Sequence, residues 1–203
     1  MRIIAGALKG RELVTPRGHR TRPTADQVRI ALMDTLMPSL GGACFLDLFA
    51  GAGSVGLEAL SRGAERAVFV ERDHDAAGAL RRNVAALHVA GQTLVLPMDA
   101  ARALNRLAAL GERFDLVFLD PPYGAGLVED TLLRLGAGEL LTLDSIVVAQ
   151  HFTKHVPPDR IGALAAYRSR RFGETTLTFF RPGAYDAAGD SRSAPGSPGR
   201  DER

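Results

Sequence analysis

The chain has 203 residues, 46% of them hydrophobic, and its 25 Lys and Arg residues nearly balance 23 Asp and Glu residues, for a formal net charge of +2. This length supports one sizeable core and is too short for two full-sized domains joined by a linker. The lone cysteine, Cys44, excludes an internal disulfide and a multi-cysteine zinc site, and it fits a reducing compartment. Because no apolar run has the length of a signal peptide or a membrane span, we expect a cytoplasmic protein without membrane contact.

The N-terminal segment is strongly basic. Its only acid up to residue 23 is Glu12, whereas its basic residues are Arg2, Lys9, Arg11, Arg17, Arg20 and Arg22. Glycines separate short apolar pairs, which predicts a small hairpin. Thr24 with Gln27 three residues later has the form of a capping box, and it predicts a helix that begins there and ends near Pro38. We therefore treat residues 1–40 as one basic N-terminal unit.

From residue 44, short apolar runs alternate with segments of helical spacing. Strands are expected at 44–49, 67–70, 93–96, 116–119 and 146–149, and helices at 54–61, 75–87, 100–110 and 127–135. This alternation predicts a Rossmann-like α/β domain with a doubly wound, mostly parallel sheet. Residues 163–171 and 175–181 add an antiparallel hairpin that turns at Gly173. We expect a seven-stranded sheet within residues 41–181, followed by a disordered tail at 182–203 that is rich in Gly, Ser, Pro and mixed charges.

A glycine-rich sequence follows the first of these strands. Gly51, Gly53 and Gly56 have the spacing G-x-G-x-x-G between a strand and a helix. The first two allow a sharp turn and close approach of a ligand, and Gly56 lets the helix lie close to the sheet. Glu71 ends the next strand, where a ribose diol would lie. Together these residues predict a site for a nucleoside-type cofactor.

Three features favour S-adenosylmethionine over a nicotinamide dinucleotide. Asp47 precedes the glycines, where it can face the cationic methionine end of the cofactor, whereas a pyrophosphate would gain little from that charge. Asp99 follows the third strand, where a carboxylate can accept a hydrogen bond from an adenine amino group. The third feature is the tetrapeptide after the fourth strand, described next. The remaining residues expected to bind the cofactor are Phe49, Ala50, Gly51, Gly53, Glu71, Arg72, Ala100 and Asp120.

Asp120-Pro121-Pro122-Tyr123 follows the buried run 116–119, at the sheet edge where ligands bind in open α/β folds. An exocyclic base amine is a poor nucleophile because its lone pair is delocalised into the ring. The Asp120 carboxylate and the Pro121 carbonyl can accept from its two N–H groups and aim the lone pair at a methyl donor. Pro122 stiffens the loop, and Tyr123 can stack the base. The histidines have no ligand-like spacing, so no metal is expected.

With these motifs the chain resembles the bacterial 16S ribosomal RNA guanine-N(2)-methyltransferases that modify guanine 966, a class I methyltransferase family. The resemblance covers nearly everything before Pro182. It includes residues 2–6 with Gly10 and Arg11, the segments 22–29 and 46–51, and the late segment 171–175. The middle motifs are typical of amino-methyltransferases in general. The basic start joined to Arg22-Pro23-Thr24 narrows the family.

The resemblance implies S-adenosylmethionine as cofactor, N(2)-methylguanosine as product, and 16S rRNA in an assembled or assembling small ribosomal subunit as substrate. We expect the protein to be a monomer. The basic start would hold RNA phosphates through Arg2, Lys9, Arg11, Arg20, Arg22 and Thr24. Three residues depart from the family pattern: Ile30 stands where an acid is common, Gln150 follows the fifth strand where Glu is usual, and Ala52 replaces a serine in the glycine loop.

Other functions stay open at this point. The same tetrapeptide serves adenine, so an adenine-amine methyltransferase acting on DNA or RNA is the nearest alternative. A nicotinamide-dependent oxidoreductase would share the glycine loop, and a non-catalytic RNA-binding assembly factor would share the fold. The product nucleoside, cofactor titration and any turnover separate these alternatives from the favoured function.

Overall fold

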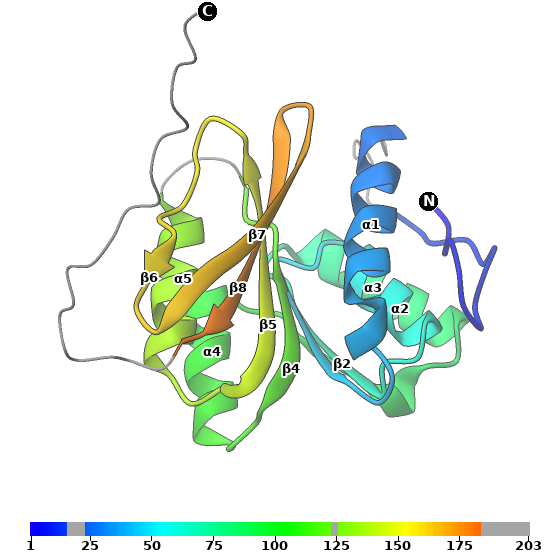
Figure 1. The fold of residues 1–203 in the computed structure, drawn as a ribbon. Helices are drawn as coiled ribbons and strands as arrows, with labels where there is room; N and C mark the ends of the chain where they lie inside the picture. The colour runs from blue at the N-terminus through cyan, green and yellow to red at the C-terminus, as the bar shows by residue number, and fades with distance from the viewer. Residues whose placement is uncertain (16–22, 123–125, 184–203) are drawn as a thin grey trace, which may run out of the picture.

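The computed structural model describes residues 1–15, 23–122 and 126–183, and the side chains of residues 23–25 are not described. The described residues form one eight-stranded sheet in the order β3-β2-β1-β4-β5-β8-β7-β6 (Figure 1). The strands are β1 (Cys44–Leu48), β2 (Arg66–Val70), β3 (Thr93–Leu96), β4 (Phe114–Leu119), β5 (Leu141–Phe152), β6 (Arg160–Ile161), β7 (Leu164–Phe172) and β8 (Thr175–Pro182). The first five strands are parallel, and the last three are antiparallel.

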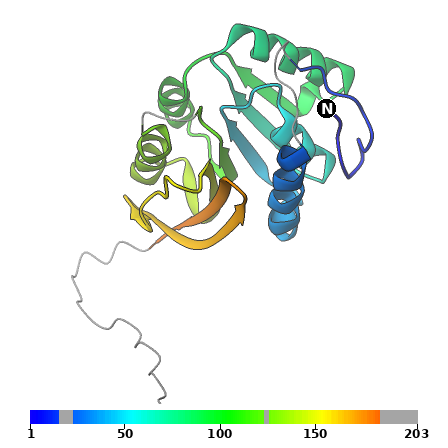
Figure 2. The ribbon, with the colours of Figure 1, turned by 90° about the horizontal axis from the view of Figure 1, so that it is seen from above.

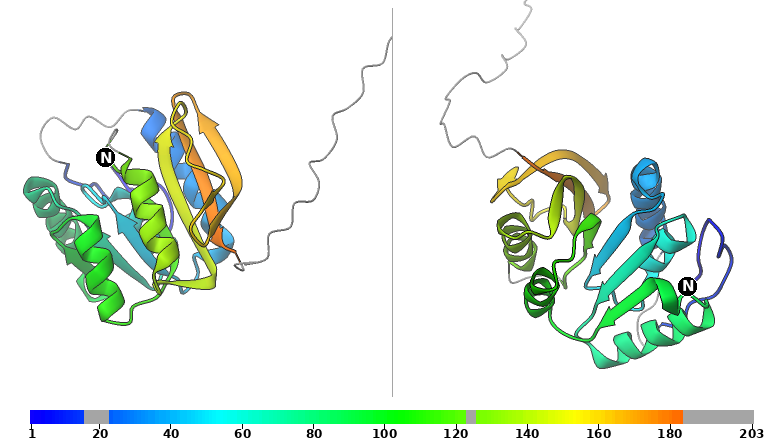
Figure 3. Two further views of the ribbon diagram at one scale, coloured as in Figure 1. Left: turned by 90° about the vertical axis from the view of Figure 1, so that its left-hand side faces the viewer. Right: turned by 90° about the horizontal axis from the view of Figure 1, so that it is seen from below.

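Helices cover both faces of this sheet (Figures 1 and 2). The helices are α1 (Pro23–Leu36), α2 (Ser54–Ser61), α3 (His74–Ala86), α4 (Ala100–Ala109) and α5 (Leu127–Ala137), with short 3-10 turns η1 (Met37–Ser39) and η2 (Ala90–Gln92). Helices α1, α2 and α3 lie on one face, and α4 and α5 pack side by side on the other (Figure 3). The predicted doubly wound α/β class with its C-terminal antiparallel hairpin is confirmed.

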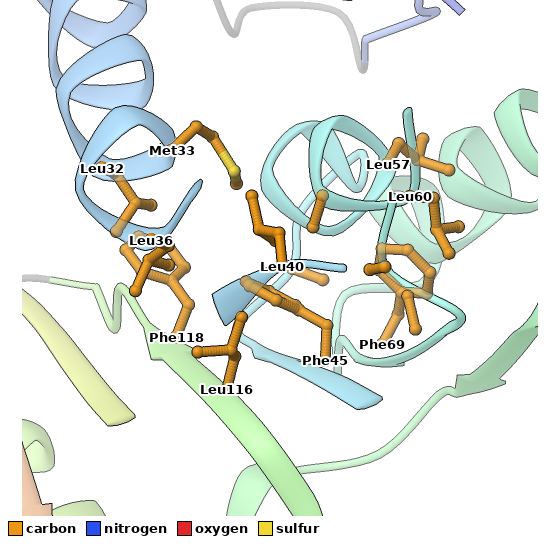
Figure 4. Close-up of a cluster of buried hydrophobic side chains, with 14 of the residues drawn as sticks. Leu32, Met33, Leu36, Leu40, Phe45, Leu57, Leu60, Phe69, Leu116 and Phe118 are labelled. Atoms are coloured by element: carbon orange, nitrogen blue, oxygen red, sulfur yellow. The ribbon is translucent and has the colours of Figure 1, made fainter. Parts of the chain in front are cut away.

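Alternate residues of the strands supply two cores. Phe45, Phe69 and Phe118 point to the side of α1 and α2, where they meet the apolar faces of both helices (Figure 4). Their sequence neighbours, such as Leu46 and Val117, belong to the core under α4 and α5. This alternation follows from the two-residue period of side chains along a strand.

The register of the parallel strands brings the predicted site residues to one edge. Leu48 of β1 lies beside Val70 and Leu119, the last residues of β2 and β4. Leu119 in turn lies beside Ala149 of β5. The residues that follow these strand ends therefore meet at the carboxyl edge of the sheet, where open α/β folds bind ligands.

Several boundaries differ from the sequence predictions. The sheet has eight described strands instead of seven because the two-residue β6 pairs with the start of β7 at the edge, and so short a strand leaves no periodic signal. Strand β5 runs to Phe152, so Gln150 lies inside the strand and does not follow it. Helix α1 begins at Pro23, so Thr24 belongs to its first turn and is not the N-cap. Proline suits a first helical position because the N–H that it lacks would have no helical partner there.

The N-terminal segment is held mainly by α2. Its described residues turn back on themselves, as the predicted hairpin requires: Arg2 and Glu12 form an antiparallel bridge, and the backbone N–H groups of Ile3 and Leu13 donate to the carbonyls of Arg11 and Met1, at 2.9 and 2.8 Å. The buried carboxylate of Glu58 accepts hydrogen bonds from the backbone N–H groups of Ile4 and Ala5, at 2.8 and 2.9 Å. Ile3 shares the core of the sheet. The boundaries at residues 40 and 181 stay predictions, and the predicted tail lies outside the described residues from residue 184 onward.

Candidate functional site

The glycine loop has the geometry that its sequence predicts. Gly51 and Gly53 have φ values of 56° and 83°, in the left-handed region where glycine is favoured. A Cβ at Gly56 would lie 2.4 Å from Cε1 of Phe69, so this glycine lets α2 lie against β2. At Gly51, no described atom lies within 4 Å of where a Cβ would stand. The loop therefore packs tightly at Gly56 and is open at Gly51.

Glu71 is bound to the loop at the end of β2. Its Oε2 accepts from the backbone N–H of Gly51 at 2.8 Å, and its Oε1 accepts from that of Asp73 at 2.7 Å. Each carboxylate oxygen keeps a further lone pair. Glu71 can therefore accept from two neighbouring hydroxyl groups, such as those of a ribose, while it orders the loop. Asp73 itself caps α3, where its side chain accepts from Ala76.

Asp47 lies in β1 and is buried against the start of α2. It is only 1% exposed and accepts from the backbone N–H of Gly56 at 2.9 Å, so it holds the glycine loop in place, and its predicted contact with the methionine end of the cofactor stays a prediction. Burial raises the pKa of Asp47 to about 7, and the nearby Asp120 and Glu71 carboxylates add to the rise, while the Gly56 hydrogen bond opposes it.

Four of the predicted cofactor residues line one small cavity of about 100 Å³, which we call the Phe49 pocket. They are Phe49, Arg72, Asp99 and Ala100. Asp99 caps α4 by accepting from the N–H of Arg102 at 2.9 Å, yet its side chain stays 43% exposed. The pocket is mostly apolar, and two carboxylates, those of Asp99 and Asp130, belong to its lining. These walls suit an adenine ring with its amino group near Asp99.

Asp120 lies where β4 ends, beside β5. Its Oδ2 accepts a hydrogen bond from Nε2 of Gln150 at 3.0 Å. Burial raises the pKa of Asp120 to about 7, and the hydrogen bond from Gln150 opposes that rise by favouring the charged form. Pro121 is buried beside it, and Pro122 is exposed. Tyr123, the predicted stacking residue, lies outside the described residues.

Two further cavities meet at Gln150. One, the Val55 pocket, has a volume of about 90 Å³ and joins Asp120 to α1 and to the start of α2. The other, the Pro122 pocket, has a volume of about 220 Å³ and lies between the start of α5 and the end of β5. Gln150 lines both, so the Asp120 carboxylate lies between a pocket on the loop side and a pocket on the α5 side.

The charge of this edge suits a cationic ligand. Asp47, Glu71 and Asp120 are close enough that the first feels the charge of the other two. A positive charge beside them would lower the raised pKa values of Asp47 and Asp120, whereas a pyrophosphate would add a fourth negative group. With the open approach at Gly51, these residues fit a cofactor that carries a sulfonium and an ammonium group better than they fit a dinucleotide.

The sequence analysis did not predict two residues of this region as site residues. Gln150 was identified only as a departure from the family pattern, and its contact with Asp120 depends on strand register. Arg29 is buried in the Val55 pocket, where its Nη2 donates to the carbonyl of Arg2 and to Asp26. Its spacing from Met33 and Leu36 along α1 was the available signal, because positions four and seven apart share a helix face.

The predicted RNA-binding residues are only partly described. Arg2, Lys9 and Arg11 are exposed, and the guanidinium of Arg11 donates to the carbonyl of Ala86 at 2.6 Å. Arg20 and Arg22 lie outside the described residues, as does the side chain of Thr24. Their role in RNA binding stays a prediction. Within the described ranges, no three His, Cys, Asp or Glu side chains gather to hold a metal ion, and no helix there is long and apolar enough to span a membrane.

Comparison with known proteins gives concordant results. The family model described as "Conserved hypothetical protein 95" matches residues 1–181. The chain is 36% identical to "Putative rRNA methyltransferase YlbH" of Bacillus subtilis, over 89% of this chain and 98% of that protein. It is 32% identical to "Ribosomal RNA small subunit methyltransferase D" of Escherichia coli K12, over 89% of each. The solved structure "Putative methyltransferase yhhF from Escherichia coli" superposes with a TM-score of 0.79 at 34% identity, covering 91% of this chain and 98% of that one.

Proposed function

The chain belongs to the Conserved hypothetical protein 95 family, and on that basis we propose that it transfers a methyl group from S-adenosylmethionine to the exocyclic amine of a guanine in 16S ribosomal RNA, giving N(2)-methylguanosine. The observation that carries the proposal is the place of Asp120. Its carboxylate lies at the carboxyl edge of the sheet, between the Val55 pocket and the larger Pro122 pocket. The names of the two relatives at 36% and 32% identity supply the ribosomal substrate.

The cofactor would lie along this edge from the Phe49 pocket to the Val55 pocket. Asp99 would accept from the adenine amine, Glu71 from the ribose hydroxyls, and the open face of Gly51 would admit the chain between them. When bound, S-adenosylmethionine supplies an electrophilic methyl group on a positively charged sulfur. Asp47 holds the loop through its hydrogen bond from Gly56, and its negative charge would stabilise the positive charge on the sulfur.

The protein residues would orient the guanine amine. One N–H donates to the Asp120 carboxylate and the other to the carbonyl of Pro121, which localises the nitrogen lone pair toward the methyl group. The amine nitrogen would form the new N–C bond with its lone pair. The S–C bond of the cofactor would break at the same time, and the electron pair of that broken bond would stay on sulfur. The amine nitrogen becomes cationic and loses its proton to Asp120 or to water. Neither a metal ion nor a covalent enzyme intermediate enters this route.

The substrate would be a small ribosomal subunit or its assembly intermediate. The protein would act on it as a monomer, in the cytoplasm. Exposed Arg2, Lys9 and Arg11 would contact phosphates. An adenine amine could be held by the same two acceptors, so Asp120 and Pro121 alone do not choose between the bases. The choice between the bases must therefore depend on other residues.

The proposal is tested by incubating the protein with methyl-labelled S-adenosylmethionine and either unmodified small subunits, their naked RNA, or large subunits. Label on small-subunit RNA alone supports the function. Label on large-subunit RNA or on DNA of the same preparation would move the activity to another nucleic acid. Titration with S-adenosylhomocysteine and with a nicotinamide dinucleotide separates the cofactors: tight binding of the dinucleotide alone would refute the proposal.

A further inference from the structure

The Pro122 pocket has walls that suit a flat heterocycle. It lies between the end of β4, the first turn of α5 and the end of β5, and α5 packs against β5 there (Figure 1). Pro121, Pro122, Leu127 and Phe152 supply apolar surfaces. Bases that leave their helix or loop are held between such surfaces and are recognised by hydrogen bonds to their edges. The pocket therefore combines stacking surfaces with room for polar recognition.

Gln150 joins this pocket to the proposed reaction centre. Its side-chain amide lines the pocket and donates to Asp120. Pro121, which follows Asp120 directly, also lines the pocket. A base that enters here would present one edge to Gln150 and Pro121, the lining residues that adjoin Asp120, while its faces contact the apolar walls.

Glu129 is a polar side chain of this pocket with no assigned role. It lies in the first turn of α5, where the helix dipole stabilises a negative charge. Its neighbour Asp130 is paired with Arg134 at 2.8 Å. Glu129, in contrast, makes no hydrogen bond or ion pair with any residue that the structure describes. Its carboxylate is thus a hydrogen-bond acceptor at the wall of the pocket.

The two purines differ at the ring nitrogen next to the reacting amine. Guanine carries a hydrogen on N1, beside its N2 amine, so both groups donate. Adenine carries a lone pair on N1, beside its N6 amine. A carboxylate in the wall of the same pocket would accept from guanine N1–H but would repel the lone pair of adenine. Sites that form a hydrogen bond with one substrate reject an analogue that leaves a buried polar group unpaired.

We propose that Glu129 is the residue that selects guanine, by accepting from N1–H while Asp120 holds the N2 amine. This inference rests on the proposed function, since it needs a base amine at Asp120. It assigns the Pro122 pocket to a purine, and it places base selection on α5, apart from the residues that orient the amine.

The test compares guanine with 2,6-diaminopurine at the methylated position. This analogue keeps the N2 amine and has a lone pair on N1, the group that Glu129 would contact. It also replaces the O6 carbonyl by an amine, a change that the wild-type protein and every variant meet alike, so the difference between variants isolates the side chain at position 129. The methylated guanine is first mapped, and the analogue is then placed there by ligating synthetic RNA. The wild-type protein should methylate guanine with a kcat/KM about 10²-fold higher or more than the analogue.

The variant Glu129→Gln should reduce that ratio by about tenfold or more, because its amide can donate to N1 of the analogue. The matched control is Glu139→Gln, which changes an exposed carboxylate just beyond the C-terminal end of α5 that pairs with Arg113. This control should keep the wild-type ratio. Glu129→Ala removes the carboxylate without offering a donor, and it should also reduce the ratio. Affinity for S-adenosylhomocysteine shows that each variant is folded.

Each outcome of these measurements either supports or overturns the role of Glu129. A ratio that stays at the wild-type value in both Glu129 variants overturns the inference, even when guanine is methylated normally. A wild-type protein that methylates both bases equally also overturns it. Failure of the proposed function has a different signature, since the wild-type protein would then put no methyl group on guanine while it still binds S-adenosylhomocysteine.

Discussion

Nε2 of Gln150 lies 3.0 Å from Oδ2 of Asp120, and it donates a hydrogen bond between neighbouring parallel strands. The contact exists because Leu119 of β4 pairs with Ala149 of β5, so the residues that follow them lie side by side. Since burial raises the pKa of Asp120 to about 7, a donor at this place has a direct consequence: it increases the fraction of Asp120 that is ionised near neutral pH.

The first prediction concerns Gln150→Leu. Asp120 accepts from the amine more strongly as a carboxylate than as a neutral acid, so kcat/KM rises with pH through its pKa. Loss of the donor removes the one interaction that lowers this pKa, and the acidic limb of the profile should move to higher pH. Gln92→Leu, a change at an amide that donates to the carbonyl of Glu65 away from the site, should leave the limb in place. An unchanged profile in Gln150→Leu would show that the hydrogen bond has no effect on Asp120.

The second prediction separates catalysis from cofactor binding. Asp120→Ala should lower kcat by at least about 10²-fold, the usual cost of losing one preorganised charge partner. Affinity for S-adenosylhomocysteine should stay near the wild-type value, because Asp120 acts on the base. The matched control is Asp144→Ala, an exposed aspartate of β5 outside the three pockets. Loss of cofactor binding in Asp120→Ala would contradict this division of roles.

The third prediction tests the packing of the glycine loop. A methyl group at Gly56 would lie 2.4 Å from Phe69 and 3.2 Å from Oδ2 of Asp47, so Gly56→Ala should destabilise the protein by about 1–3 kcal/mol and weaken cofactor binding. Gly41→Ala, where no described atom lies within 4 Å of the added carbon, is the control. Urea unfolding measures both. Equal stability of the two variants would mean that α2 can move away from β2 without cost.

The fourth prediction concerns the pH dependence of stability without cofactor. Asp47 has a pKa of about 7 in the folded protein against an ordinary value of 3.8, so the folded state binds more protons than the unfolded state between these values. The contribution of Asp47 to stability is therefore present below about pH 4 and is lost as pH rises to about 7. Asp47→Asn should flatten this part of the curve in urea unfolding series between pH 4 and pH 8. An identical slope in the variant would show that Asp47 ionises normally.

The fifth prediction tests the basic N-terminal surface. The double variant of Arg2→Gln and Lys9→Gln should weaken RNA binding and reduce the slope of log affinity against log salt by about 1 for each lost phosphate contact. Arg113→Gln is the control, since that arginine lies outside the N-terminal segment and pairs with Glu139. An unchanged salt slope in the double variant would place the phosphates elsewhere on the protein.

Much of the fold followed from the sequence because its signals are local. Apolar runs bounded by turn residues gave β1 to β4 within two residues of their observed ends, and the glycine spacing gave the loop. The strand β5 was underestimated because Leu141–Asp144 is mostly exposed and has no apolar run. The two residues of β6 form a strand only because β7 lies beside them.

Site residues that follow a single strand could be predicted from the sequence. Contacts between residues of two different strands were less predictable. Glu71, Asp99 and Asp120 were identified because each follows an apolar run. The contact of Gln150 with Asp120 joins residues 30 positions apart, and only strand register reveals it. The hydrogen bond of Asp47 with Gly56 likewise depends on the face of β1 that α2 covers, and the predicted contact of Asp47 with the cofactor stays a prediction.

The most direct test of the central claim is the identity of the methylated nucleoside. Small subunits that have been incubated with S-adenosylmethionine and the protein are digested, and the modified nucleosides are identified by mass spectrometry. The account predicts N(2)-methylguanosine with the wild-type protein and its absence with Asp120→Ala. N(6)-methyladenosine in its place would contradict the account and assign the enzyme to adenine.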